Sequence, residues 1–309
     1  MISTPCFVCG EDCPTLFLKK TDQQQHEWNI VRCQACKFLY VNARPSEEWL
    51  REFYQDPAYF KGREDGYQDY LGMKHFLEAQ TIDRLPIIER FQPGGRLLDV
   101  GCAAGFFLEK AKERSWQIAG VEWAKEMSDH ARALLQIEIP PTLEEAGYPA
   151  ESFDVVTSWD CLEHVWDPRA HLQEIRRLLR PGGLLAVSTT NAENLRAART
   201  PERWEEFKPP GHLNYFALDS LRTLLLNTGF EPLRFRGIAP LFQRLPDPLI
   251  GPLLALQRVV GHRRNKLTPF WWINAGLHRT THTLSRWYHT AFYSEYQWSE
   301  GLEAYARKL

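Results

Sequence analysis

The chain has 309 residues and an almost balanced charge, with 37 Lys and Arg against 39 Asp and Glu. That balance and the 44% hydrophobic content are typical of an ordinary globular protein, and they argue against wholesale disorder and a generally basic nucleic-acid binder. No apolar run reaches the roughly 18 residues that a transmembrane helix needs, and the first residues do not resemble a secretory signal. We therefore expect a cytoplasmic protein.

Cysteine spacing at the start of the chain predicts a metal site. Five of the seven cysteines lie between Cys6 and Cys36, and four of them form two C-x-x-C pairs with a long spacer between the pairs. The pairs are Cys6 with Cys9 and Cys33 with Cys36. Each C-x-x-C turn presents two sulfurs to one side of an ion, and four thiolates suit a tetrahedral Zn²⁺. With a short strand on each side of the second pair, residues 1–44 have the pattern of a zinc ribbon.

Four cysteine ligands leave no open coordination position, so we expect a structural Zn²⁺ ion. Cys13 is then a bystander. Two disulfides in a secreted domain are the alternative, which the lack of a recognisable signal disfavours.

A glycine-rich turn in the centre of the chain predicts a ligand site. An apolar strand over 96–100 leads into Gly101-Cys-Ala-Ala-Gly105, and a helix is predicted over 106–114. Such a turn between a strand and a helix lets the backbone approach a ligand closely. The next strand ends in Glu122, and the spacing of this acid from Gly101 suits a carboxylate that holds both hydroxyls of a ribose. An incidental acid in a plain α/β unit is the alternative.

Strands and helices continue to alternate beyond Glu122. We predict helices over 124–135 and 168–180, a short strand near 137–139, and strands over 152–158 and 184–188. This alternation implies a parallel sheet with helices on both faces, and a ligand at the carboxyl ends of its strands.

Five motifs stand in the order and at the spacing found in one family. They are LLDVGCAAGFF (97–107), GVE (120–122), SFDVV (152–156), LEHV (162–165) and LRPGGL (179–184). In these motifs the chain resembles class I S-adenosylmethionine-dependent methyltransferases, in particular the branch with ubiquinone-type and natural-product small-molecule enzymes. The resemblance covers about 97–236, and it extends forward through 40–45 to members with an amino-terminal zinc module.

The resemblance implies an α/β fold with a Rossmann-like seven-stranded sheet. Its sixth strand corresponds to 231–236 and its antiparallel seventh strand to 301–307, so 237–300 becomes an insertion between two strands that normally form a hairpin. We therefore divide the chain into a zinc ribbon (1–44), a helical linker and cofactor-side cap (45–90), and a methyltransferase domain (91–309).

By the same resemblance, the chain binds S-adenosylmethionine at the turn and at the strand ends. The residues implied are Asp99, Gly101 and Gly105 around the methionine part, Glu122 at the ribose, Trp123, Leu143 and Glu144 around the adenine, and Trp159 and Asp160 beside the methyl group.

Several of these residues have a plainer alternative role. In these alternatives, Asp99 only caps the turn, and Trp123 and Trp159 are core aromatics. The glutamate that follows Glu144 could face the adenine in its place. The turn also departs from the usual Gly-x-Gly-x-Gly of the family. Ala103 replaces the middle glycine, which is tolerable if φ at Ala103 is negative.

Two histidines are candidates for the catalytic base. Methyl transfer is an in-line displacement that depends largely on positioning, but an oxygen or carbon nucleophile must also lose a proton. A histidine is best poised to take it near neutral pH. His212, on a loop after the strand over 184–188, is the first candidate, and His164, at the end of the strand over 152–158, is the second. A structural hydrogen bond is the alternative role for each.

We therefore expect a methyltransferase acting on a small molecule such as a sugar, an isoprenoid or a polyketide, without a nucleic-acid partner. A methyltransferase that docks RNA or protein through the zinc ribbon is one alternative, although 1–50 lacks a dense basic cluster. A non-catalytic cofactor-binding protein is another.

The insertion over 237–300 carries seven Lys and Arg against three Asp and Glu, together with four tryptophans. It predicts a helical lid with a peripheral membrane contact. A dimer interface or simple packing on the domain is the alternative.

Overall fold

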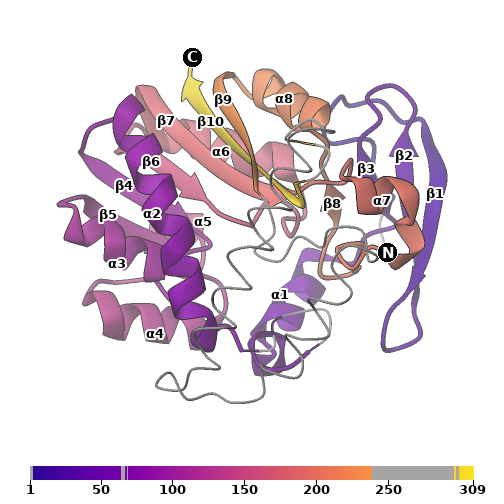
Figure 1. Ribbon diagram of the computed structural model, residues 1–309, viewed down its shortest axis with the longest axis horizontal. Helices are drawn as coiled ribbons and strands as arrows, with labels where there is room; N and C mark the ends of the chain where they lie inside the picture. The colour runs from indigo at the N-terminus through magenta and orange to yellow at the C-terminus, as the bar shows by residue number, and fades with distance from the viewer. Residues whose placement is uncertain (1–2, 64–66, 68, 239–295, 297–298) are drawn as a thin grey trace, which may run out of the picture.

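The computed structural model describes residues 3–63, 67, 69–238, 296 and 299–309, which form two sheets with helices around them (Figure 1). The predicted helical insertion therefore lies almost wholly outside the described residues. No described helix is long and apolar enough to cross a membrane.

The larger sheet has six strands in the order β5-β4-β6-β7-β10-β9. They are β4 (Arg96–Val100), β5 (Gln117–Val121), β6 (Phe153–Ser158), β7 (Leu179–Thr190), β9 (Phe230–Ile238) and β10 (Gly301–Lys308). The first four pair in parallel, and β10 runs antiparallel to both β7 and β9. The carboxyl ends of β4, β5 and β6 consequently meet at one edge of the sheet, where a Rossmann-like fold binds its ligand.

The helices follow the alternating pattern that the sequence predicts. They are α1 (Glu47–Gln55), α2 (Lys74–Phe91), α3 (Phe106–Glu113), α4 (Lys125–Leu135), α5 (Leu143–Ala146), α6 (Pro168–Leu178), α7 (Leu195–Arg199) and α8 (Leu218–Asn227), with 3-10 turns η1 (Pro57–Phe60), η2 (Leu71–Met73) and η3 (Pro201–Arg203). Apolar side chains of α2, α3 and α4 cover one face of the sheet, and those of α6 and α8 cover the other. Because both faces of the sheet are covered, nearly every residue of the central strands β4 and β6 is buried.

The short strand expected near 137–139 is not among the strands of the described residues, so the larger sheet has six strands there rather than the seven that the resemblance implies. The segment does lie beside β5, because the Glu122 amide donates to the Pro140 carbonyl at 3.1 Å. Two features prevent a ladder. Gln136 ends α4 with a left-handed φ of 57°, and Pro140 and Pro141 follow shortly after it. Proline has no N–H to donate to a strand neighbour.

The smaller sheet has four strands in the order β1-β2-β3-β8. They are β1 (Pro14–Thr21), β2 (Glu27–Cys33), β3 (Leu39–Asn42) and β8 (Asn214–Tyr215). The strand β1 was not predicted, and it fills the long spacer between the two cysteine pairs. The strand β8 comes from the methyltransferase part of the chain and pairs with β3 through Leu39 opposite Tyr215 and Tyr40 opposite Asn214.

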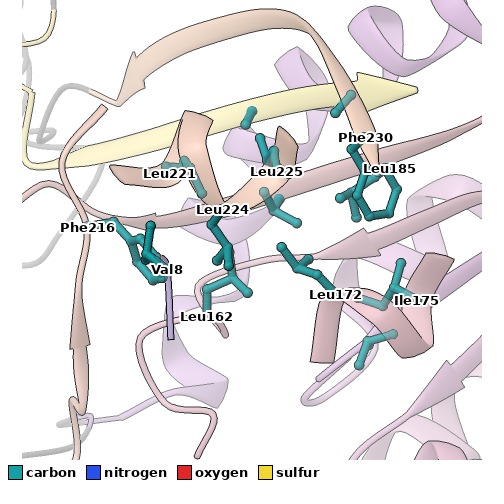
Figure 2. Close-up of a cluster of buried hydrophobic side chains, with 14 of the residues drawn as sticks. Val8, Leu162, Leu172, Ile175, Leu185, Phe216, Leu221, Leu224, Leu225 and Phe230 are labelled. Carbon is teal, nitrogen blue, oxygen red and sulfur yellow. The ribbon is translucent and has the colours of Figure 1, made fainter. Parts of the chain in front are cut away.

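The two sheets also share buried side chains. Val8, between the first two cysteines, lies in the same apolar cluster as Leu162, Phe216 and Leu224 (Figure 2). The cluster continues through α6 and α8 to the face of the larger sheet. The predicted ribbon is therefore packed against the methyltransferase core, and one strand of its sheet belongs to that core.

Candidate functional site

The glycine turn lies between β4 and α3, as the sequence predicts. Gly101 and Gly105 both have left-handed backbones, with φ of 77° and 82°. The Gly101 amide donates to the Val121 carbonyl at 2.9 Å, which ties the turn to the end of β5. A Cβ at Gly105 would lie 2.9 Å from the Leu135 side chain, so glycine is needed where α3 packs against α4. The left-handed conformation accounts for both glycines, and close packing adds to it at Gly105.

Ala103 departs from the expectation, because its φ is 45° rather than negative. A left-handed backbone costs a residue with a Cβ roughly 1–2 kcal/mol. The Ala103 amide gains a hydrogen bond from this conformation, since it donates to Oε2 of Glu122 at 2.8 Å. The turn is thus shaped by the carboxylate across from it.

Glu122 is only 9% exposed, at the carboxyl end of β5. Its second oxygen, Oε1, accepts a hydrogen bond from the Ala124 amide at 2.7 Å. Burial raises the pKa of Glu122, and its bonds to backbone amides oppose that rise. The backbone on both sides therefore fixes the predicted ribose carboxylate in place.

Asp99 is buried near the end of β4. The Thr157 hydroxyl, from the neighbouring strand β6, donates to its Oδ1 at 2.6 Å. Burial raises the pKa of Asp99 to about 7, and the nearby charge of Glu122 adds to the rise. The structure therefore brings Asp99 and Glu122 together around the turn.

Trp159 and Asp160 follow β6 directly. The Trp159 ring meets the edge of Phe107 at 5.4 Å, and the Arg84 guanidinium lies over it at 4.2 Å. Its Nε1 is buried and has no hydrogen-bond partner in the described part of the chain. The Asp160 amide donates to the Ser188 hydroxyl at 2.8 Å, and that hydroxyl donates to Asp160 Oδ1 at 2.7 Å. A buried indole N–H without a partner is a donor available to a ligand.

The three predicted adenine-side residues are placed differently. Trp123 is half-buried beneath α1, where the Arg51 guanidinium lies 5.2 Å from its ring and Gln55 donates to its carbonyl at 2.7 Å. Leu143 is half-buried against the core. Glu144 is exposed, and its side chain makes no hydrogen bond or ion pair with any described residue. The structure therefore supplies no contact that singles out Glu144.

The two candidate histidines lie together, although they come from distant parts of the chain. Their ring centroids are 4.7 Å apart, in an edge-to-face arrangement. His164 Nδ1 lies 2.7 Å from the Gly211 carbonyl, and His212 Nδ1 lies 3.1 Å from the Glu206 carbonyl. A carbonyl oxygen only accepts hydrogen bonds, so Nδ1 carries the proton in both rings. Each Nε2 is then an unprotonated acceptor.

Burial lowers the pKa of both imidazoles, to about 4 for His164 and well below the usual value for His212. Both are therefore neutral at pH 7, and a neutral imidazole is the form that accepts a proton. Glu206 Oε2 lies 3.6 Å from His212 Nδ1, where it would stabilise the imidazolium formed when Nε2 takes up a proton.

Sequence reasoning overlooked Glu163 as a site residue, although it precedes His164. It is 2% exposed, and its Oε2 has no hydrogen-bond partner among the described residues. Glu163, His164 and His212 bring side-chain polar atoms within 4.8 Å of one another. The Glu-His dipeptide at the end of a predicted strand was the available signal.

An aromatic cluster from the end of α1 and the segment between α1 and α2 was also missed as part of the site. Its rings are Phe53, Tyr54, Tyr59, Phe60, Tyr67 and Tyr70. Tyr70 stacks on Phe106 at the start of α3, with ring centroids 6.3 Å apart. Burial raises the pKa of Tyr67, and the carboxylates of Asp160 and Glu163 add to that rise. Tyr67 and Tyr70 pack against the cluster that contains Ala104 and Phe106, so these tyrosines lie over the same sheet edge as the turn. The density of aromatic residues between α1 and α2 was the only signal in the sequence.

The four predicted metal ligands form a compact cluster. Cys6 and Cys36 have sulfurs 3.5 Å apart, as do Cys9 and Cys33, and all four sulfurs lie within 4.8 Å of one another. Four sulfurs at about 2.3 Å from one tetrahedral ion would lie about 3.8 Å apart, so the cluster fits Zn²⁺. The Cys13 sulfur is 4.0 Å from that of Cys33. It lies beside the cluster and outside the predicted set.

Comparisons with known proteins agree with this geometry. The family model described as a methyltransferase domain matches residues 73–234, more than half of the chain. Among solved structures, an S-adenosylmethionine-dependent methyltransferase from Archaeoglobus fulgidus has a similar fold, with a TM-score of 0.51 and 16% identity. That likeness covers 76% of this chain and 94% of the other.

Two curated proteins are similar to this chain at higher identity. A ubiquinone biosynthesis O-methyltransferase from Ruegeria pomeroyi is 33% identical over 171 residues, which cover 52% of this chain and 69% of that enzyme. An enzyme of the same name from Aeromonas salmonicida is 38% identical over 105 residues, which cover 32% of this chain and only 44% of that enzyme. The chain therefore belongs to the methyltransferase-domain family, and it is an S-adenosylmethionine-dependent methyltransferase.

Proposed function

We propose that this methyltransferase acts on a hydroxyl group of a small-molecule acceptor, of the sugar, isoprenoid or natural-product type. The observation that carries the proposal is the histidine pair beside Asp160 and Glu163, at the carboxyl end of β6. A hydroxyl oxygen must lose its proton when it is methylated, and Nε2 of buried His212, which has no hydrogen bond to any described residue, is an acceptor for that proton. The names of the curated relatives, which are O-methyltransferases, support an oxygen acceptor.

S-adenosylmethionine supplies an electrophilic methyl group on a sulfonium sulfur. We propose that Gly101, Gly105 and Asp99 hold its methionine part, that Glu122 binds its ribose and that Trp123 borders its adenine. The fixed carboxylate of Glu122 and the left-handed turn opposite it support this assignment. Leu143 and Glu144 stay in the proposal on the resemblance alone.

His212 is the proposed base, and His164 is the second candidate. In the proposed step, His212 Nε2 takes the proton from the substrate hydroxyl, and the Glu206 carboxylate stabilises the imidazolium that forms. Trp159 and Asp160 border the reacting atoms in this proposal, and the unpartnered Trp159 Nε1 offers a hydrogen bond there.

We further propose one structural Zn²⁺ ion held by Cys6, Cys9, Cys33 and Cys36. The sulfur distances support it, and four thiolates leave no position for an acceptor. Docking of RNA or protein on the ribbon is less favoured, because the ribbon packs on its own methyltransferase core and β8 pairs with its edge strand β3. Peripheral membrane contact through 237–300 stays a prediction that co-sedimentation with anionic liposomes at low and high salt would test.

Labelling of fractionated cell extract tests the acceptor class. The protein is incubated with methyl-labelled S-adenosylmethionine and with separate small-molecule, RNA and protein fractions. We expect label in the small-molecule fraction, bound through an ether that survives mild base. Label in the RNA or protein fraction would instead support the docking alternative.

A further inference from the structure

Arg44 is a buried arginine whose contacts reach from the ribbon to the histidine pair. It follows β3, and its side chain is 0% exposed. Its Nε donates to the Val41 carbonyl at 3.0 Å, and its Nη1 donates to the Trp166 carbonyl. Its Nη2 donates to the Leu213 carbonyl at 3.2 Å and to Asn214 Oδ1 at 2.7 Å. One guanidinium thus joins the ribbon, the segment after β6 and the segment around β8.

All the acceptors of this guanidinium are neutral. Within the described residues, no carboxylate lies within ion-pair distance of Arg44, although the charge of Asp167 acts on it from further away. The rings of Phe7 at 4.4 Å and Tyr40 at 5.8 Å lie beside the guanidinium. Burying a charge without a paired acid costs several kcal/mol. An apolar side chain would fill the same space without that cost. The presence of an arginine here, with its set of hydrogen bonds (the Arg44 fork), therefore needs another explanation.

Asn214 extends the fork to both sides of Glu163 and His164. Its Nδ2 donates to the Leu162 carbonyl at 2.9 Å and to the Val165 carbonyl at 2.7 Å. These carbonyls bracket the two site residues in the chain. The Asn214 side chain therefore fixes the segment that carries His164, while Arg44 fixes Asn214.

Leu213 ties the second histidine into the same arrangement. Its amide donates to the Glu163 carbonyl at 2.7 Å, and its own carbonyl accepts from Val41 at 2.9 Å as well as from Arg44. His212 is the residue immediately before it. The 4.7 Å separation of the two imidazoles is therefore set by the peptides that the Arg44 fork holds.

We propose that Arg44 is a positioning residue for the His164–His212 pair, and that through it the ribbon forms part of the active-site framework. The inference rests on the proposed function for the role of the pair. The planar guanidinium matters because its three nitrogen donors point at fixed angles. They can therefore set the spacing between the segment after β6 and the segment around β8, whereas the flexible ammonium of a lysine cannot. The two cysteine pairs then stabilise the strand from which Arg44 reaches.

The test uses the full-length, metal-loaded protein with Arg44→Met and Arg44→Lys. Arg32→Met is the matched control, because Arg32 also lies over a ring of the ribbon, Phe17 at 4.5 Å, but is exposed. The main readout is the titration of the imidazoles, observed by NMR on protein labelled in histidine. Signals are assigned with His164→Gln and His212→Gln. Hydrogen exchange, zinc content and calorimetry with S-adenosylmethionine complete the set.

The imidazoles are surrounded by several groups that also titrate or carry charge. These are Tyr54 from α1, Glu206 and Lys208 from the loop before β8, Glu163 beside His164, and Tyr215 from β8. None of them is changed by the variants. Because Arg44→Lys keeps the positive charge that Arg44→Met removes, a shift in imidazole pKa that appears in both variants reports the spacing and hydration of the pair.

We expect Arg44→Met to raise the imidazole pKa values by more than one pH unit, toward their usual range, because water reaches the separated rings. The amides of Leu213 and Asn214 should exchange at least tenfold faster. S-adenosylmethionine should still bind one to one, within about twofold of the wild-type affinity, since Arg44 does not contact the turn. Arg44→Lys should show the same changes to a smaller extent, and it decides the test if Arg44→Met does not fold.

Unchanged imidazole titrations in a folded Arg44→Lys protein would overturn the proposal, even if its thermal stability fell. That outcome would leave Arg44 with a structural role only. A different result would overturn the proposed function: methylation of the small-molecule fraction by His212→Gln at the wild-type rate. The imidazole titrations would still report whether Arg44 positions the pair.

Discussion

Glu163→Gln should make the protein more stable at alkaline pH while it damages the site. The Glu163 carboxyl is buried beside Asp160 and Glu206, and its Oε2 has no hydrogen-bond partner among the described residues. Burial raises its pKa to about 8, and the charge of Asp160 adds to the rise. The folded protein therefore holds Glu163 protonated at neutral pH, whereas the unfolded chain ionises it near the usual value.

The size of the effect follows from proton linkage. Because the folded-state pKa is the higher one, the unfolded chain releases the proton first as the pH rises, and folding is penalised by about 1.4 kcal/mol per pH unit between about 4.5 and 8. The penalty is about 1 kcal/mol at pH 5 and about 4 kcal/mol at pH 8. Glutamine has nearly the same shape and does not ionise, so the variant avoids this penalty.

Urea unfolding of wild type and Glu163→Gln at pH 5, 6.5 and 8 measures the effect. The variant's advantage in unfolding free energy should grow by about 3 kcal/mol from pH 5 to pH 8. Glu205→Gln is the control, since Glu205 is 80% exposed and should show no such trend. A difference between Glu163→Gln and wild type that stays constant over this range would refute the reasoning. Methyl transfer should fall in the same variant, because the Glu163 side chain lies within 4.8 Å of the proposed bases His164 and His212. This would be the stability–activity trade-off expected of a buried polar residue at a functional site.

Three further variants test the turn and the metal. Glu122→Gln should weaken S-adenosylmethionine binding about tenfold or more in calorimetry, because charge-assisted bonds are worth about 1.5–3 kcal/mol each, whereas exposed Glu113→Gln should bind normally. Ala103→Gly should raise the free energy of unfolding by about 1 kcal/mol with unchanged cofactor affinity, since glycine adopts the left-handed turn without strain; a less stable variant would contradict the role given to φ. Cys6→Ser should lose about one equivalent of zinc in metal analysis, and full metal content in that variant would rule out the four-cysteine site.

The larger sheet was predictable because its signals are local. An apolar run such as Leu97-Leu98 identifies a buried strand, and Gly101, Gly105 and Glu122 stand at fixed spacings from it. The missing strand near 137–139 shows the limit of this approach. The alternating Ile137 and Ile139 favoured a strand, but Pro140 and Pro141 leave too few donors to form a ladder.

The arrangement of the histidine pair was not predictable from local patterns. It depends on the short strand β8, which pairs with β3 although the two strands lie far apart in the sequence. It also depends on Arg44, which the sequence shows only as a charged residue after a strand. Long-range pairings of this kind leave no periodicity in the chain.

The sign of φ at Ala103 was a different kind of error. Steric preference alone favours a negative value for alanine. The hydrogen bond to Glu122 reverses that preference, and it can be recognised only after the turn and the end of β5 are placed side by side.

Methyl transfer under single-turnover conditions tests the account most directly. Wild type and His212→Gln are each loaded with labelled S-adenosylmethionine, whose affinity is measured in parallel, and mixed with the small-molecule fraction that accepts label. The account predicts transfer about a hundredfold slower in His212→Gln, with cofactor affinity within about twofold of wild type. Transfer at the wild-type rate would contradict the assignment of His212 as the base.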